Sequence, residues 1–286
     1  EGSIGRTQPK IEYYTKAILD ALEQAKKFVG NPLGAYVYPK ALIRDWNNIT
    51  VEGIDALIAE GKKNMKDNLH LELDVKKALS DADIAIEAMA ENTEEKITFY
   101  ESIKGILDDK TILCTNSSTL LPSTFAEHTG RPEKYMALHF ANSIWAHNTA
   151  ECMGHAGTDP DIYKQVVQFA KDINMEPIEV HKEQPGYVLN SLLVPLLDAG
   201  QNLWARGIAD PETIDKAWRI GTGAPVGPFQ MMDVIGLQTV SNVLKMKPDA
   251  KDPESVTYRL IKMVGEKIEK GELGVAAGKG FYDYDE

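Results

Sequence analysis

The chain has 286 residues, with 43 acidic and 31 basic side chains, and a formal net charge of −12. This acidity argues against a general nucleic-acid-binding protein, which usually presents a basic face. The length suits two domains, each large enough to bury a core. The longest apolar run, residues 191–197, is much shorter than the roughly 20 residues that a membrane span needs. We therefore expect neither nucleic acid nor a membrane as a partner.

Cysteine usage is sparse. Cys114 and Cys152 provide neither a disulfide framework nor the spacing of a metal site. We expect both to be buried thiols of a reducing compartment. The chain is therefore expected to be cytoplasmic and to hold no metal ion.

Extended and helical patterns alternate over the first part of the chain. We expect a helix over residues 10–29, irregular chain over 30–57, a strand over 69–73 and a short helix over 75–80. Further helices are expected over residues 93–107 and from Pro160, with Asp159 as N-cap. Four apolar strands are expected at residues 83–90, 111–115, 135–140 and 177–180. Strands that alternate with helices predict an α/β fold with a parallel sheet covered on both faces.

This alternation stops at Gln184-Pro185-Gly186, and only helical patterns follow. We expect an α/β domain over residues 1–183 and an all-α domain over residues 184–286. The helices expected in the second domain cover residues 187–206, a segment opened by Asp210-Pro211, residues 228–245, and a segment that runs from Asp252-Pro253 to about Gly271.

Polar side chains follow the ends of several predicted strands. Asn116 and Ser118 come after the strand 111–115, His139 lies at the end of the strand 135–140, and Glu91 follows the strand 83–90. Ligands of open α/β sheets bind outside the carboxyl ends of the strands, so these residues are expected at one site. Each also has an ordinary explanation on its own, such as a helix cap for Ser118 or a structural histidine.

Two further residues complete a set that can move a proton. Glu151 follows His139 by twelve residues, and Asn190 follows the Pro-Gly break. A neutral imidazole can take the proton of an alcohol, and a carboxylate can fix its tautomer and stabilise the imidazolium. A hydroxyl such as Ser118 and an amide such as Asn190 can hold the reacting oxygen.

Six stretches of the chain resemble signature segments of the 3-hydroxyacyl-CoA dehydrogenase family, in its order and near its spacing. They are IEAMAEN (86–92), TNSSTL (115–120), ALHFAN (137–142), PGYVLNSLLVP (185–195), GTGAPVGPFQMMDVIGL (221–237) and GKGFYDY (278–284). The resemblance covers residues from about 70 to the end of the chain. It implies a Rossmann-like domain followed by a helical domain for substrate binding and homodimerisation. It also implies NAD, with NADP not excluded, and hydride transfer at the C3 hydroxyl of a short-chain 3-hydroxyacyl-CoA in fatty acid metabolism.

The resemblance also assigns roles to particular residues. His139 is implied to be the catalytic base and Glu151 its partner, while Ser118 and Asn190 contact the reacting oxygen. The residues implied to lie along the nicotinamide half of the dinucleotide are Glu91, Lys96 and Asn116.

The chain departs from the family pattern in three regions. The residues before about 70 barely match the family, so the CoA-contacting residues are not assigned. Where the family usually has His-Phe-Phe-Asn-Pro, residues 139–143 read HFANS, which leaves the acyl preference open. The family begins with a strand, a G-x-G-x-x-G turn, a helix and a second strand, and this chain shows none of these. The glycines of GTGAPVG, residues 221–227, have a different spacing and are expected to form a helix-to-helix turn. We therefore expect the natural protein to continue upstream by about 30 residues, and the chain as given to bind NAD weakly.

Two alternatives remain beside an acyl-CoA dehydrogenase. Enzymes of this architecture also oxidise free 3-hydroxy acids or sugar acids, and turnover of acetoacetyl-CoA against free acetoacetate separates that possibility. A chain without the Gly-rich opening could instead be a non-catalytic binding or dimerisation protein, which failure to bind dinucleotide would favour.

Overall fold

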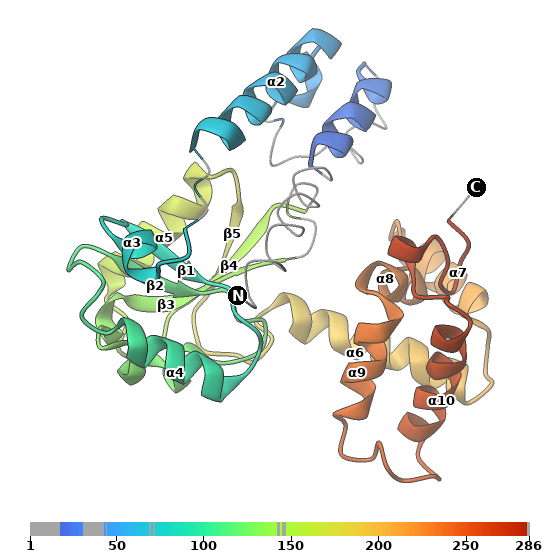
Figure 1. Ribbon diagram of the computed structural model, residues 1–286. Helices are drawn as coiled ribbons and strands as arrows, with labels where there is room; N and C mark the ends of the chain where they lie inside the picture. Colours follow the sequence, from blue (N-terminus) through green and yellow to red (C-terminus); the bar gives the residue numbers. More distant parts are fainter. Residues whose placement is uncertain are drawn as a thin grey trace. The chain divides into compact units, whose positions relative to one another are not determined.

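The computed structural model describes residues 18–30, 43, 45–68, 70, 72–141, 144 and 147–284. The chain forms two compact units, Glu1–Val188 and Leu189–Glu286 (Figure 1). The first half of the helix predicted over residues 10–29 lies outside the described residues, and residues 18–25 of it are helical. Short 3-10 turns are η1 (Lys26–Phe28), η3 (Trp46–Asn48), η4 (Pro122–Thr124), η5 (Ala126–Thr129), η6 (Pro132–Lys134) and η7 (Val275–Ala277).

A five-stranded sheet of order β1-β2-β3-β4-β5 forms the centre of the first unit. Its strands are β1 (Ile84–Glu87), β2 (Ile112–Thr115), β3 (Tyr135–Phe140), β4 (Thr149–Met153) and β5 (Glu176–Val180). Strands β1, β2 and β3 are parallel, β4 runs antiparallel to β3, and β5 is parallel to β4. The predicted α/β class is confirmed, but the antiparallel strand β4 was not predicted.

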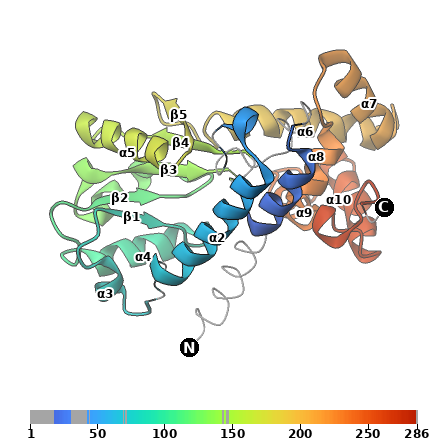
Figure 2. The ribbon, with the colours of Figure 1, turned by 90° about the horizontal axis from the view of Figure 1, so that it is seen from above.

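Helices cover both faces of this sheet, α4 (Thr93–Ile103) on one and α5 (Pro160–Asp172) on the other (Figure 2). Successive residues of a strand point to opposite faces. In β3, Met136 and Leu138 pack in the core with α5, whereas Tyr135 packs in the core with α4. His139 follows the same alternation as Tyr135, so its side chain lies on the α4 face of the sheet.

Local capping sets where the helices of this unit begin. Asp159 caps α5 as predicted, with its carboxylate accepting the Asp161 N–H at 2.7 Å. The cap of α4 is Asn92, one residue before the Thr93 at which the predicted helix began. The predicted short helix is α3 (Val75–Leu79), capped by Asp74.

Two predictions near the N-terminus are wrong. Helix α2 (Val51–Asn68) extends into the stretch predicted to be irregular. Gly53 and Gly61 obscure its periodicity, yet Ile54 and Ile58 are buried one turn apart. The strand predicted over 69–73 is not formed at residues 70, 72 and 73, while 69 and 71 lie outside the described residues. The chain there is exposed and turns directly into α3.

The second unit is helical over its described residues. Its helices are α6 (Leu189–Ala205), α7 (Pro211–Thr222), α8 (Pro228–Ile235), α9 (Leu237–Lys245) and α10 (Val256–Glu269). The helix predicted over residues 228–245 is broken at Gly236, whose φ of 92° is readily adopted only by glycine. Glycines 223 and 227 end α7 and begin α8, so the predicted helix-to-helix turn is confirmed. In the described part of the chain, no helix is both long and apolar enough to cross a membrane.

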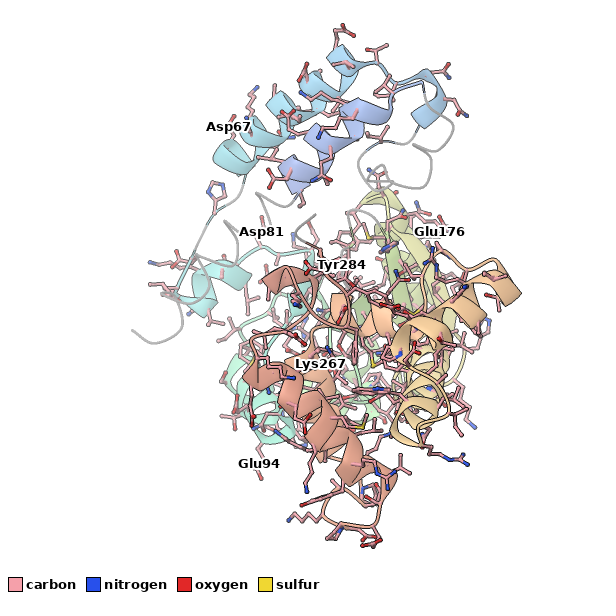
Figure 3. All side chains as sticks on the ribbon, turned by 90° about the vertical axis from the view of Figure 1, so that its right-hand side faces the viewer. Asp67, Asp81, Glu94, Glu176, Lys267 and Tyr284 are labelled. Atoms are coloured by element: carbon pink, nitrogen blue, oxygen red, sulfur yellow. The ribbon has the colours of Figure 1, made fainter. Side chains whose placement is uncertain are left out.

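Two buried aspartates, one in α7 and one in α8, accept hydrogen bonds from the C-terminal segment of this unit. Asp233 accepts the Phe281 N–H at 2.8 Å, the Tyr282 N–H at 3.0 Å and the Tyr284 hydroxyl at 2.9 Å (Tyr284 is labelled in Figure 3). Asp215 of α7 accepts the Tyr282 hydroxyl at 2.9 Å and also caps the N-terminus of α8. Two of the family-like stretches, residues 221–237 and 278–284, therefore meet and hold each other in place.

Candidate active site

The central feature of the first unit is a buried histidine–glutamate pair on neighbouring strands. In the antiparallel pairing of β3 with β4, His139 lies directly opposite Glu151, and directly opposed residues project from the same face. His139 Nδ1 is 3.0 Å from Glu151 Oε2. The two residues are only 5% and 2% exposed. The prediction that their side chains lie within hydrogen-bond reach is confirmed, and the twelve-residue spacing is explained by the return of the chain into β4.

This geometry sets which nitrogen of the imidazole can react. An ionised carboxylate only accepts hydrogen bonds, so the proton of a neutral His139 is assigned to Nδ1 and the lone pair to Nε2. The second oxygen of Glu151 accepts the Val188 N–H at 3.0 Å. The pair can therefore take a proton at Nε2, while the carboxylate stabilises the imidazolium that forms.

The loop after β2 carries Ser118, and Glu91 holds this loop in place. Glu91 Oε1 accepts the Ser117 hydroxyl at 2.7 Å and both the N–H and the hydroxyl of Thr119 at 2.8 Å. Partial burial opposes ionisation, but these hydrogen bonds outweigh it and lower the pKa of Glu91 below its ordinary value. Ser118 itself is exposed on this loop. Its contact with a reacting oxygen stays a prediction.

Asn116 connects the ends of two strands. Its side-chain oxygen accepts the Phe140 N–H at 2.8 Å, and its own N–H donates to Glu87 O at 2.8 Å. The residue after His139 is thereby tied to the loop that carries Ser118. Asn116 and Glu91 thus organise this edge of the sheet, and their predicted contacts with the dinucleotide stay predictions.

Lys96 differs from the other predicted cofactor residues because it is fully buried. Its Nζ lies 2.6 Å from Glu87 Oε1. Glu87 Oε2 accepts the Tyr100 hydroxyl at 2.7 Å and the Thr115 hydroxyl at 2.8 Å. Burial above all, with the neighbouring Tyr135 and Glu87, raises the pKa of Tyr100 far above its ordinary value. In this arrangement the ammonium of Lys96 is enclosed, and the geometry does not favour its predicted contact with a dinucleotide.

Asn190 is the second residue of α6 and belongs to the second unit. The strands that carry His139 and Glu151 belong to the first unit. Its predicted contact with the reacting oxygen therefore stays a prediction.

Sequence reasoning missed one side chain that touches the pair. The ring of Tyr187 stacks on the His139 imidazole, with centroids 4.7 Å apart and an interplanar angle of 16°. Tyr187 lies within the family-like stretch 185–195, but a tyrosine between a Pro-Gly turn and a helix carries no chemical signal. Only its position against His139 marks it as part of the site.

The start of α4, which follows the carboxyl end of β1, does not supply a pyrophosphate site. Such a site uses free backbone N–H groups at a helix N-terminus. At α4, the Asn92 side chain already accepts the Glu94 and Glu95 N–H groups at 3.0 and 3.2 Å. The carboxylates of Glu94 and Glu95 also add negative charge there. The start of α4 therefore does not fit the phosphates of a dinucleotide.

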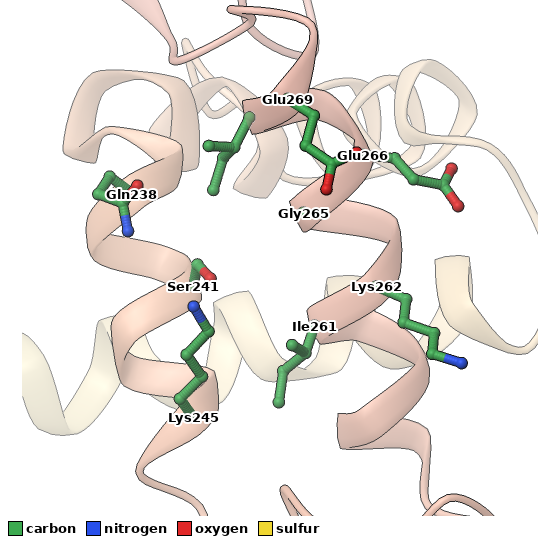
Figure 4. A pocket seen from close by; sticks show the side chains of 9 residues that line it. Gln238, Ser241, Lys245, Ile261, Lys262, Gly265, Glu266 and Glu269 are labelled. Atoms are coloured by element: carbon green, nitrogen blue, oxygen red, sulfur yellow. The ribbon is translucent and has the colours of Figure 1, made fainter.

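A cavity of about 430 Å³ lies elsewhere, between α9 and α10 of the second unit (Figure 4). Lys245 from α9 and Glu269 from α10 are among its charged lining residues. None of the predicted site residues lines it. Within the described ranges, no cluster of three or more His, Cys, Asp or Glu side chains could hold a metal ion.

Comparison with known proteins identifies the class to which this fold and site belong. Residues 43–184 match the model of the 3-hydroxyacyl-CoA dehydrogenase NAD binding domain, and residues 186–284 match the C-terminal domain of the same family. A probable 3-hydroxybutyryl-CoA dehydrogenase of Bacillus subtilis is 31% identical over 205 residues, which are 72% of this chain and 70% of that protein. The human mitochondrial hydroxyacyl-coenzyme A dehydrogenase is 30% identical over 214 residues, 74% of this chain and 67% of that protein.

Solved structures of related enzymes have a similar fold. A diketoreductase described as acting on dicarbonyl compounds is 44% identical, with a TM-score of 0.73 over 93% of this chain and 87% of that one. The (S)-3-hydroxybutyryl-CoA dehydrogenase of Ralstonia eutropha is 26% identical, with a TM-score of 0.62 over 82% of this chain and 86% of that one. The protein is thus an oxidoreductase with a Rossmann-type NAD-binding domain and a helical C-terminal domain. It belongs to the 3-hydroxyacyl-CoA dehydrogenase family, whose cofactor is NAD.

Proposed function

We propose that the protein transfers a hydride between NAD and C3 of a short-chain 3-hydroxyacyl-CoA, and that His139 is the general base. One observation carries this proposal: His139 Nδ1 lies 3.0 Å from a buried carboxylate, which leaves Nε2 as the basic nitrogen. NAD supplies the hydride acceptor when it is bound. The residues of the chain have to bind the alcohol, orient it and move its proton.

The proposed proton transfer uses both members of the pair. His139 Nε2 takes the C3 hydroxyl proton as the alcohol is oxidised, and Glu151 stabilises the positive charge on the ring. In the reverse direction the imidazolium returns the proton to the oxygen of the ketone. Ser118 and Asn190 are proposed to hold that oxygen. An intact base–carboxylate pair gives no support to the alternative of a non-catalytic binding chain.

The names of the relatives favour a CoA thioester such as 3-hydroxybutyryl-CoA as the substrate. The 44% identity to a diketoreductase favours a second candidate, a free dicarbonyl compound or 3-hydroxy acid. The oxidised forms share one chemistry, because acetoacetyl-CoA also has two carbonyl carbons separated by one carbon. Comparison of kcat/KM for acetoacetyl-CoA, free acetoacetate and a free 1,3-diketone distinguishes the two candidates. We expect acetoacetyl-CoA to be preferred, and a preference for the free ketones would favour the second.

Replacement of His139 tests the mechanism. His139→Gln is expected to lower kcat by about 10²- to 10⁴-fold, the range for loss of a general base, while cofactor affinity changes little. His128→Gln is a matched control, because His128 also contacts a glutamate, Glu101 at 2.8 Å, but is exposed in the same unit. Near-normal turnover of the His139 variant would refute the mechanism.

We further propose a homodimer formed through the helical unit. The support is the large apolar side chains that this unit exposes, including Leu192 at 70%, Ile220 at 75% and Val234 at 62%. Exposed apolar residues that occur singly are normal. An obligate interface of about 2,000 Å² or more needs many exposed apolar side chains.

A cytoplasmic location and a role in fatty acid metabolism stay predictions. The prediction of location rests on two buried, unpaired cysteines.

A further inference from the structure

The segment Gln184–Val188 approaches the histidine–glutamate pair through a strained turn. Tyr187 N–H donates to Gln184 O at 2.9 Å, with Pro185 at the second position and Gly186 at the third with a φ of 76°. This is the pattern of a type II turn. Tyr187 itself has a φ of 54°, which is unusual for a bulky residue. Such a conformation costs on the order of 1–3 kcal/mol and persists only where surrounding contacts hold it.

Several contacts of this segment are made with the predicted site. The Tyr187 ring stacks on His139 at 4.7 Å, and its hydroxyl donates to the Ser117 carbonyl at 2.7 Å. The next N–H along the chain, that of Val188, donates to Glu151 at 3.0 Å. Tyr187 is completely buried. Burial, followed by the nearby carboxylate of Glu91, raises the pKa of its hydroxyl above its ordinary value.

One hydrogen bond alone leaves an imidazole with rotational freedom. The bond from Nδ1 to Glu151 fixes one atom of the His139 ring, and the ring can still tilt about the line of that bond. A flat aromatic surface against the ring face removes this tilt. Catalysis needs such control, because a misplacement of about 1 Å can cost on the order of 10²-fold in rate.

We propose that Tyr187 is a positioning residue for the His139 base. Its ring sets the plane of the imidazole, and its hydroxyl connects that plane to the loop that carries Ser118. The base and the predicted oxygen-binding serine are thereby held by one side chain. This inference rests on the proposed function, because it takes His139 to be the base.

Two substitutions distinguish the contribution of the Tyr187 ring to catalysis from that of its hydroxyl. Tyr187→Met fills much of the space without an aromatic face, and Tyr187→Phe keeps the face without the hydroxyl. We expect kcat to fall about 10- to 100-fold in the Met variant, the order of loss expected from misplacing a catalytic group. The Phe variant is expected to lose less than about 5-fold, and KM for either substrate is expected to change by less than about 3-fold in both, because the ring acts on orientation. Equal losses in the two variants, or a loss confined to KM, would overturn the inference.

A double-mutant comparison asks whether Tyr187 acts through His139. In a His139→Gln background, Tyr187→Met is expected to change the residual kcat by less than about twofold, since residues that act as a unit are strongly non-additive. The same 10- to 100-fold loss in both backgrounds would show that Tyr187 acts through another group. If His139→Gln alone is near normal, the proposed function fails first, and the two failures are therefore distinguishable.

A spectroscopic measurement tests the same point without turnover. In protein labelled with ¹⁵N-histidine, the imidazole of His139, assigned through the His139→Gln variant, is expected to show a single Nδ1–H tautomer in the wild type and in Tyr187→Phe. Tyr187→Met is expected to keep this tautomer, because Glu151 still accepts from Nδ1, but to broaden the Nε2 signal as the ring samples several tilts. Tyr187→Leu is a second variant in case the Met substitution prevents folding. An unchanged His139 spectrum in a folded variant without the aromatic ring would overturn the inference.

Discussion

Glutamine at position 151 is the sharpest test of the carboxylate. Glu151 is 2% exposed, and its donors include His139 Nδ1 and Val188 N, each at 3.0 Å. Glutamine has nearly the same shape but only one acceptor oxygen. One of these donors therefore loses its acceptor, and the imidazolium loses the adjacent negative charge.

The size of the effect follows from these contacts. A hydrogen bond to a charged group contributes about 1.5–3 kcal/mol, and about 1.4 kcal/mol corresponds to a tenfold change in rate. If that stabilisation is needed mainly when His139 is protonated, Glu151→Gln lowers kcat about 10- to 150-fold. This is milder than the loss expected from His139→Gln, because the base itself remains.

The assay is steady-state reduction of acetoacetyl-CoA, followed through NADH absorbance, with urea unfolding to check that the variant is folded. Glu101→Gln is the matched control, because Glu101 accepts from the exposed His128 at 2.8 Å. We expect it to keep wild-type activity. A Glu151→Gln enzyme within twofold of wild type would refute the role assigned to the carboxylate.

Two further outcomes are expected. Asp233→Ala should lower the free energy of unfolding in urea by at least about 3 kcal/mol, since it removes three hydrogen bonds to a buried carboxylate. Asp198→Ala is the control, because it breaks a partly exposed ion pair with Lys247 and should lower the free energy of unfolding by only about 0–1 kcal/mol. Equal losses in the two variants would show that the burial of Asp233 is unimportant. Sedimentation at micromolar concentration should show a homodimer, and a monomer would exclude the proposed interface.

Local signals in the sequence were enough to predict most of the elements. The apolar runs that become β2 and β3 are continuous because both faces of these strands are buried. Asp159 and Asp210, each followed by proline, start α5 and α7 as predicted. Such signals are read from neighbouring residues along the chain, so they do not depend on the tertiary structure. The family-like segments also correctly indicated the class of enzyme.

The sequence by itself was insufficient to predict an element whose formation depends on segments far away in the chain. The strand β4 is five residues long and has Glu151 at its centre, so its pattern does not resemble that of a buried strand. It forms because its backbone pairs with β3 and β5, and that pairing sets His139 opposite Glu151. Helix α2 was missed for a similar reason, since its glycines weaken the local pattern and its buried face is defined by packing.

The contrast is clearest at the candidate site. The sequence alone determined which residue types could carry the chemistry, because His139 lies at the end of one predicted strand, Ser118 follows another, and the ends of parallel strands share one edge. Only the tertiary structure decided how they are held. The register of β3 with β4 joins His139 to Glu151, and the turn at Pro185-Gly186 brings Tyr187 against the imidazole. Contacts between residues so far apart in the chain depend on the packing of the whole unit, which no local pattern records.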